Sequence, residues 1–128
     1  MNFPADLRYT ASHEWIRTES DGTLTVGITD LAKDSLGELV YVDLPAIGRK
    51  LAAAESCAVV ESTKAASDVY APVAGEVVAV NEDLSGTPQA VNESPYEKGW
   101  LFKLKPAAAG SEQSLLSVDQ YKSESGAA

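Results

Sequence analysis

The chain is poor in the residues that disulfides, metal sites and membrane spans require. Its 128 residues include one cysteine, Cys57, and one histidine, His13. A single cysteine excludes an internal disulfide and favours a reducing compartment, so we expect a cytoplasmic protein. A lone histidine excludes a histidine-rich metal site, and we expect no bound metal. No apolar run is long enough to cross a bilayer, and the N-terminus lacks the pattern of a signal peptide.

Basic residues are also scarce. There are 10 lysines and arginines against 19 aspartates and glutamates, which gives a net charge of −9 and a pI near 4.4. Nucleic acid is therefore not an expected partner, because phosphate contacts need basic side chains. An acidic surface could steer encounters with basic patches on partner proteins, or it could serve solubility alone. Composition does not separate these two roles.

The length and an apolar content of 45% suit one domain with a modest core. We expect a single domain over residues 1–128 that is monomeric, with a flexible tail at 123–128. A first hairpin is expected from 14–18 and 23–28, with its turn near Asp21-Gly22.

Further segments indicate more short strands and little helix. Asp30 is expected to cap a short helix that Gly37 ends. The run Leu39–Leu44 predicts a central strand because it is nearly all apolar. A C-terminal helix over Leu115, Leu116 and Val118 could be capped by Ser111 or Ser114. The remaining predicted strands are 76–80 and 100–105.

Two similar turns frame the middle of the chain. Pro45-Ala46-Ile47-Gly48 and Pro72-Val73-Ala74-Gly75 each precede a strand-like run. This repeat indicates two similar halves that face each other, although such turns are common by themselves. The predicted fold class is all-β, a barrel–sandwich hybrid with short helices that include one at the C-terminus.

Between these turns lies the most informative stretch. The β-prone runs Cys57–Val60 and Val69–Ala71 flank a polar, small-residue centre, which predicts a hairpin. Lys64 stands at its middle and is the only basic residue between Lys50 and Lys98. A lysine at an open tip suits covalent modification of its amine. The alternative is a solvated lysine that keeps the hairpin end from pairing with other chains.

The neighbours of this lysine favour modification. The run Val60-Glu61-Ser62-Thr63-Lys64-Ala65 resembles the lipoyl-lysine segment of lipoate-carrying proteins. Biotin carriers usually place methionine on both sides of their lysine, whereas Thr63 and Ala65 flank it here, which favours lipoate.

Over most of its length the chain resembles the H-protein family of the glycine cleavage system. Segments shared with lipoyl domains in general are the lysine hairpin and the second Pro-x-x-Gly turn. Segments typical of H proteins alone are Ser12-His13-Glu14-Trp15 and the stretch from Val91-Asn92 through Pro95-Tyr96 to Gly99-Trp100. The turn at Ala52-Ala53-Ala54 departs from relatives that often have glycine there, so a positive φ at Ala54 would cost on the order of 1 kcal/mol.

The resemblance implies a non-catalytic carrier with lipoate amide-linked to Lys64, and with Glu61 and Asp68 flanking the lysine for recognition. The implied partners are glycine decarboxylase, which uses pyridoxal phosphate and loads an aminomethyl group; aminomethyltransferase; dihydrolipoamide dehydrogenase, which reoxidises the arm; and lipoyl-attachment enzymes. It also implies a cleft that shelters the loaded arm, for which we expect Ser12, Glu14 and Asp68 to bind the cationic amine.

Other functions stay open at this point. The chain could carry or donate lipoate for another system, such as a 2-oxoacid dehydrogenase, although the Ser-His-Glu-Trp segment argues against that enzyme. It could also be an unmodified binding domain. A Cys57–His13 nucleophile–base pair is a weaker possibility, because Cys57 lies in an apolar run where a small core residue is expected.

Overall fold

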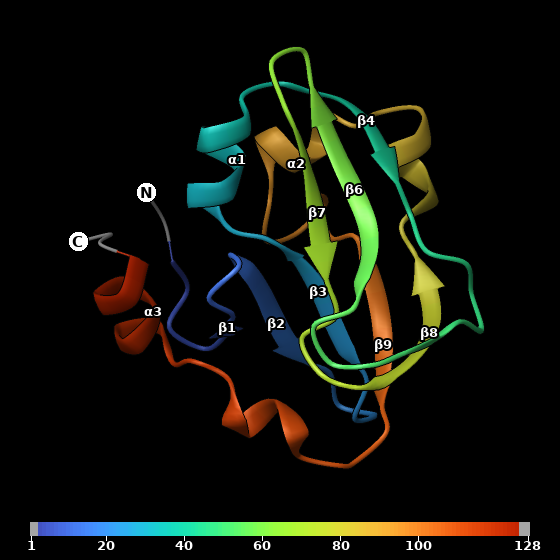
Figure 1. Ribbon diagram of the computed structural model, residues 1–128, viewed down its shortest axis with the longest axis vertical. Helices are drawn as coiled ribbons and strands as arrows, with labels where there is room; N and C mark the ends of the chain where they lie inside the picture. Colours follow the sequence, from blue (N-terminus) through green and yellow to red (C-terminus); the bar gives the residue numbers. More distant parts are fainter. Residues whose placement is uncertain (1–2, 126–128) are drawn as a thin grey trace.

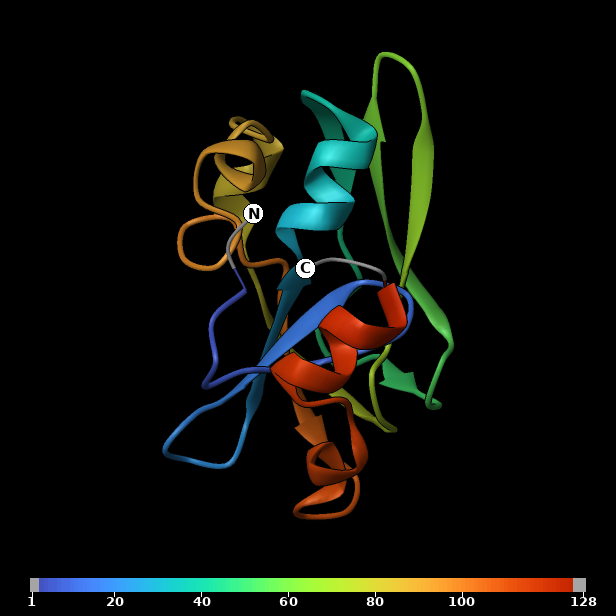
Figure 2. The same cartoon turned by 90° about the vertical axis from the view of Figure 1, so that its left-hand side faces the viewer.

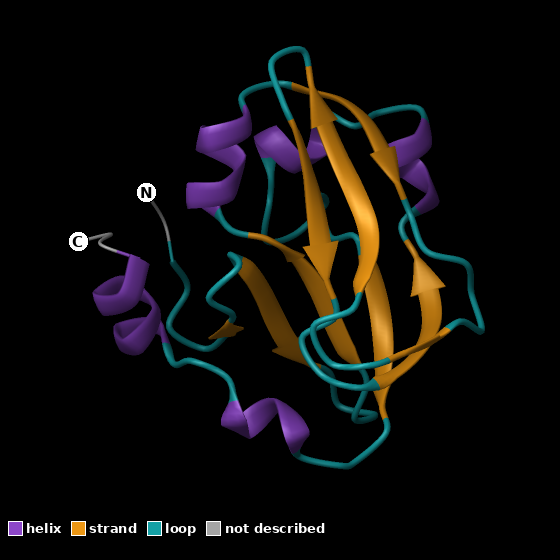
Figure 3. Cartoon of the chain, in the orientation of Figure 1, coloured by secondary structure: helices purple, strands orange, loops and turns teal. Residues whose placement is uncertain are grey.

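The computed structural model describes residues 3–125, and two antiparallel sheets form its framework (Figures 1 and 3). A three-stranded sheet lies in front of a six-stranded sheet in the view of Figure 1. Apolar side chains from both sheets meet in one buried cluster. The predicted all-β class is confirmed, and the short helices cover the ends and sides of the sheets.

The six-stranded sheet has the order β1-β2-β3-β9-β8-β5. Its strands are β1 (Arg8–Tyr9), β2 (Glu14–Thr18), β3 (Leu24–Ile28), β9 (Phe102–Pro106), β8 (Gly75–Val80) and β5 (Lys50–Leu51). The predicted first hairpin is β2 and β3. The two Pro-x-x-Gly turns precede β5 and β8, which pair with each other through Lys50 opposite Glu76 and Leu51 opposite Gly75. The two repeated turns therefore lead into neighbouring, paired strands of one sheet.

The three-stranded sheet has the order β4-β6-β7. Its strands are β4 (Leu39–Asp43), β6 (Ser56–Ser62) and β7 (Ala66–Tyr70). The prediction that Leu39–Leu44 forms a central strand is wrong, because β4 lies at an edge. Its apolar run does not all point inward: Val40 and Tyr41 keep 49% and 52% of their surface exposed.

The helices are short. They are α1 (Asp30–Leu36), α2 (Ala90–Glu93) and α3 (Val118–Ser125), with 3₁₀ turns η1 (Glu82–Ser85) and η2 (Ser111–Ser114). The cap of α1 is Thr29 rather than Asp30, since the Thr29 hydroxyl accepts from the Ala32 amide. Gly37 ends this helix as predicted, with a φ of 83° that favours glycine. Among residues 3–125, none of the helices has the length and apolar character that a bilayer crossing requires.

The C-terminal helix begins later than the sequence predicts. Ser111 and Ser114 belong to η2, and Leu116 is extended and pairs with Tyr9 across an isolated bridge. The helix continues through residues 123–125, which we expected in a flexible tail, and 126–128 lie outside the described residues. Sequence periodicity missed this because Leu115 and Leu116 pack as a strand-like segment against β1.

An aromatic cluster fixes α3 to the rest of the protein. Tyr121 stacks on Tyr9 with ring centroids 4.8 Å apart, and Phe3 packs edge-on against both rings. The Tyr121 hydroxyl contacts His13 Nδ1 and Thr29 Oγ1, each at 2.8 Å. Figure 2 shows α3 in front of β1 and β2, and β1 is the strand that it contacts. The chain after η2 is thereby held against β1 and β2.

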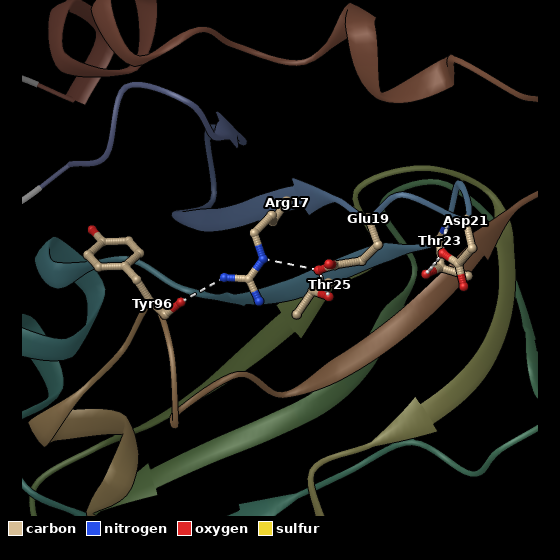
Figure 4. A network of polar contacts seen from close by, with 6 residues as sticks. All are labelled: Arg17, Glu19, Asp21, Thr23, Thr25 and Tyr96. Atoms are coloured by element: carbon tan, nitrogen blue, oxygen red, sulfur yellow. Dashed lines mark hydrogen bonds and ion pairs between the residues drawn. The ribbon is translucent and has the colours of Figure 1, made fainter.

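The long connection from β8 to β9 is tied to β2 by a polar network (Figure 4). The Arg17 guanidinium donates to the Tyr96 carbonyl at 3.1 Å and pairs with Glu19 at 3.0 Å. Hydrogen bonds from Thr25 and Arg17 hold the pKa of the Glu19 carboxyl below its usual range. Trp15 adds a buried hydrogen bond to the Pro95 carbonyl at 2.9 Å. These contacts are structural, since they lock a loop to a hairpin.

The turn before β6 contains a strained residue, as the sequence suggested. Ala54 has a φ of 66°, in the left-handed region that disfavours residues with a Cβ atom. Its amide donates to the Ala71 carbonyl at 2.8 Å, which holds the turn against the end of β7. The tertiary contact therefore imposes the strained conformation.

Replacing Ala54 with glycine should raise the free energy of unfolding by about 0.5–1 kcal/mol, because glycine adopts positive φ without steric cost. Urea unfolding measures the change. Ala53→Gly is the matched control, since Ala53 has no positive φ and the extra freedom of its unfolded chain should lower stability. Equal changes of the same sign in both variants would show that Ala54 is not strained.

Candidate functional site

The β6–β7 hairpin carries Lys64 at its tip, as predicted (Figure 1). The strands pair from Ser56 opposite Tyr70 up to Glu61 opposite Ala66. Their inward side chains, among them Val60 and Val69, are buried in the core. Because this face is buried, a slip of one residue would expose the apolar set, so the register is strongly fixed. The position of Lys64 is fixed with it.

Ser62 holds the backbone of the tip. Its amide donates to the Ala65 carbonyl at 2.8 Å. Its hydroxyl accepts from the amides of Lys64 at 3.3 Å and Ala65 at 3.1 Å, and lies 3.2 Å from the Ala65 carbonyl. A short polar side chain that bonds its own turn is a common device for ordering a loop. The tip is therefore structured although it projects.

The Lys64 side chain is exposed, and within residues 3–125 its ammonium has no ion-pair partner. It runs past the end of α1: a Cβ atom added at Gly37 would lie 3.7 Å from Lys64 Cε. Figure 2 shows α1 beside the hairpin. The amine is thus accessible to another protein while its stem lies close to Gly37.

Glu61 and Asp68, which we expected to flank the lysine, lie on the same face of the three-stranded sheet. In the register Glu61 pairs with Ala66, and Asp68 pairs with Val59, two residues before Glu61. Side chains at even spacing share a face, so both carboxylates point away from the core. Asp68 also accepts from the Ser56 hydroxyl at 3.2 Å.

A second candidate feature is the carboxylate of Glu14, at the start of β2. It is only 1% exposed. One oxygen accepts from the hydroxyls of Thr10 and Ser12, the latter at 2.6 Å, and the other accepts from the Tyr70 amide at 3.2 Å. In residues 3–125 no lysine, arginine or histidine pairs with it. The structure therefore orients a buried carboxylate with neutral donors alone.

Glu14 and Ser12 line a cleft of about 500 Å³ at the end of β7. Its other lining residues come from Tyr9–Ala11, from the turn at Ala53-Ala54, from Tyr70–Pro72, and from the C-terminal segment Ser114–Leu116 with Glu124. The lining is mostly apolar around a small polar set, as binding clefts commonly are. A cationic group that enters this cleft would meet a carboxylate that carries no compensating charge.

Asp68 is not part of this lining. It lies on β7 between Lys64 and Tyr70, two residues before Tyr70, and so on the same face as that cleft residue. The structure therefore brings Ser12 and Glu14 together and places Asp68 on the way from the lysine to the cleft. Along β7, Tyr70 lies roughly 20 Å from Lys64, at ~3.3 Å per residue.

The alternative catalytic pair is not assembled. Cys57 is buried on β6, where its Sγ lies 3.4 Å from the Val69 carbonyl, and burial raises the pKa of its thiol to about 12. His13 instead contacts Tyr121. A thiol in this state is not a nucleophile near neutral pH. No group of three or more potential metal ligands occurs among the residues that the structure describes.

Sequence reasoning missed several residues of these sites. Thr10 could have been suspected, because a threonine four residues before a glutamate is close enough to bond it across a turn. The Tyr70 amide and the Leu115-Leu116 wall gave no signal, since they reach the cleft only through tertiary packing. Ser62 fits a known turn pattern that the sequence analysis did not use.

Comparisons with known proteins agree with this geometry. The family model described as "Glycine cleavage H-protein" matches residues 7–126. A glycine cleavage system H protein of Neisseria meningitidis serogroup B is 60% identical over 123 residues, which cover 96% of each chain. One from Ralstonia nicotianae is 57% identical over 126 residues and 98% of each chain.

A solved structure gives the same result. The crystal structure of a glycine cleavage system H protein from Mycobacterium marinum superimposes with a TM-score of 0.87 at 42% identity, covering 97% of this chain and 99% of that one. The barrel–sandwich fold predicted from sequence is confirmed by this match. The chain belongs to the glycine cleavage H-protein family.

Proposed function

We propose that the chain is the lipoyl-bearing shuttle of the glycine cleavage system and that Lys64 is the residue to which lipoate is attached. The observation that carries this proposal is the exposed, unpaired lysine at the tip of a hairpin whose register is fixed by burial. Family membership supports the system in which it works. It does not favour a carrier of a 2-oxoacid dehydrogenase.

The residues present fit the lipoyl group. Amide attachment needs a primary amine that can enter another enzyme's site, and the Lys64 amine has no ion-pair partner within residues 3–125. Small and short polar neighbours, Thr63 and Ala65, leave room around it. When bound, lipoate supplies a dithiolane that accepts a one-carbon unit and is reduced, and this redox chemistry belongs to the cofactor.

The protein's own residues would hold the lysine in position and provide the surface that partner enzymes recognise. Ser62 keeps the tip ordered, so the lysine is presented in one place. Glu61 and Asp68 offer carboxylates beside the tip for recognition. The partners we propose are glycine decarboxylase, aminomethyltransferase, dihydrolipoamide dehydrogenase and lipoyl-attachment enzymes. A monomeric state and a cytoplasmic location stay predictions from the sequence.

We assign the Glu14 cleft to the cationic amine of the loaded arm. Glu14 would attract the ammonium, because its buried charge is uncompensated by any base among the described residues. The Ser12 hydroxyl donates to Glu14 and so still has lone pairs with which to accept from the amine. The apolar walls would limit access of water to the cargo. Asp68 would guide the amine along β7.

Lys64→Arg should abolish lipoylation and glycine cleavage, because arginine keeps the charge but has no primary amine to acylate. Intact mass after incubation with a lipoate ligase, and glycine-dependent release of carbon dioxide in the reconstituted system, measure the two effects. Lys50→Arg, at an exposed lysine on β5, is the control and should behave as wild type. Lipoylation of the Lys64→Arg protein would refute the assignment.

Removing the polar groups Glu14 and Ser12 of the cleft, or the Asp68 carboxylate between the lysine and the cleft, should speed the loss of ammonia from the loaded protein when aminomethyltransferase is absent. We expect about 10-fold or more for Glu14→Ala, the range of one charge-assisted hydrogen bond, and less for Ser12→Ala and Asp68→Asn. Asp68 is exposed, so its variant should fold normally. Glu82→Gln on η1 is the control. Reoxidation by dihydrolipoamide dehydrogenase should be unchanged, and equal ammonia release in all variants would exclude sheltering.

A further inference from the structure

The outer face of the three-stranded sheet carries an exposed patch next to Lys64. Cross-strand pairing places Tyr41 beside Glu61 and Asp43 beside Val59, and continues from Val59 to Asp68. With Val40, these six residues form what we call the lysine-side patch. Figure 1 views this face directly, and among the described residues no helix lies in front of it.

A β-bulge produces the apolar part of the patch. The register shifts between Leu39 and Tyr41, so Val40 is an extra residue in β4. A bulge lets two successive side chains avoid the core, and Val40 and Tyr41 are accordingly 49% and 52% exposed. Bulges often occur where a strand re-aims side chains for function. Exposing a tyrosine and a valine together on an edge strand is otherwise unfavourable.

The rest of the patch is acidic. Asp43, Glu61 and Asp68 contribute three carboxylates, and none of the six residues is basic. In the described part of the chain, none of these carboxylates makes an ion pair. An aromatic and aliphatic centre with unpaired acids around it is the complement of an apolar hollow lined by arginine or lysine.

We propose that the lysine-side patch is the docking surface for the enzyme that attaches lipoate to Lys64, and that this enzyme presents an apolar hollow with basic residues at its rim. The inference rests on the proposed attachment of lipoate at Lys64. In the attachment step an amide bond forms between Lys64 Nζ and the lipoyl carbonyl carbon of an ATP-derived adenylate. The bond from that carbon to AMP breaks, and the amine loses a proton to solvent.

The short reach of the unmodified lysine side chain favours the attachment enzyme as the partner that binds the patch. Before modification the amine is only about 6 Å from its Cα, so an enzyme that acts on it must contact the hairpin itself. A standard interface covers about 800 Å² on each partner, a disc of roughly 16 Å radius. Tyr41 lies about 11 Å from the tip by strand geometry, within that disc. Enzymes that act on the far end of a finished arm do not need this contact.

The position of the cleft gives a second reason. Glu14 contacts the amide of Tyr70, at the opposite end of β7 from the tip. A shuttle partner must reach the cargo in the cleft. The attachment enzyme acts at Lys64 and needs no contact at the cleft end of the hairpin. The centres of the two surfaces are thus separated along the same hairpin, with Tyr41 and Glu61 toward the lysine, Glu14 at the base, and Asp68 between them.

The test compares the rate of lipoate attachment with the turnover of the lipoylated protein by its partner enzymes. Tyr41→Thr removes the aromatic ring and keeps a β-branched residue suited to a strand. With a purified lipoate–protein ligase, lipoate, ATP and Mg²⁺, the kcat/KM for attachment, followed by intact mass, should fall about tenfold through KM. Ile47→Thr is the matched control: Ile47 is 62% exposed, lies beyond the end of β4 away from the tip, and should change the rate less than twofold.

Asp43→Asn tests the charged rim without touching the apolar centre. Its attachment rate should fall at low salt and depend less steeply on salt than the wild type. Thermal unfolding confirms that each variant is folded, as expected for substitutions at exposed positions.

Once lipoylated by prolonged incubation, the Tyr41→Thr protein should turn over normally with glycine decarboxylase and dihydrolipoamide dehydrogenase. Unchanged attachment in Tyr41→Thr would overturn the proposal. Equal loss in attachment and in turnover would also overturn it, because the patch would then be a general docking surface. Failure of the wild-type protein to gain a lipoyl group would instead refute the proposed function itself.

Discussion

The pairing of β6 with β7 is the constraint on which the candidate site depends. Its inner face buries Val60 and Val69 almost completely, and each such side chain stabilises the fold by about 1.5–3 kcal/mol. This burial fixes the register, and the register decides which residue stands at the tip and which side chains face outward. The apolar core therefore determines where Lys64 is presented, although Lys64 itself makes little contribution to stability.

The same pairing separates two surfaces. Inward positions bind the hairpin to the six-stranded sheet, and outward positions, Glu61 and Asp68 among them, are free to meet other proteins. At the base of the hairpin, the Tyr70 amide donates to Glu14 and links β7 to β2 of the other sheet. The cleft is thus built where the sheets meet, so its shape depends on the packing of both. A carrier that must visit several enzymes benefits from a rigid body with such separate contacts.

The sequence predicts most of the strands and turns, but little of how distant segments pack together. Alternating apolar residues, glycines and the lysine hairpin indicate the strands, the tip and the end of α1 correctly, because these features follow from nearest neighbours along the chain. The edge position of β4 could not be predicted, since an apolar run looks the same at an edge with a bulge as in a buried strand. Thr29 rather than Asp30 caps α1, and its hydroxyl also contacts the distant Tyr121. Leu116 is extended because it pairs with the distant Tyr9. The cleft walls likewise come from segments that are far apart in the sequence.

Glu14 shows why such a site has to be read from the assembled structure. In sequence it is one glutamate among many, but the fold removes it from solvent and surrounds it with Thr10, Ser12 and the Tyr70 amide. Burial of a carboxylate without a cationic partner is unfavourable for folding, and neutral donors offset only part of that cost. Part of the cost of burying this carboxylate therefore remains, and an ammonium group that bound beside Glu14 would offset it. The same donors also fix the carboxylate's orientation, so the proposed binding of a cation would need little reorganisation of Glu14.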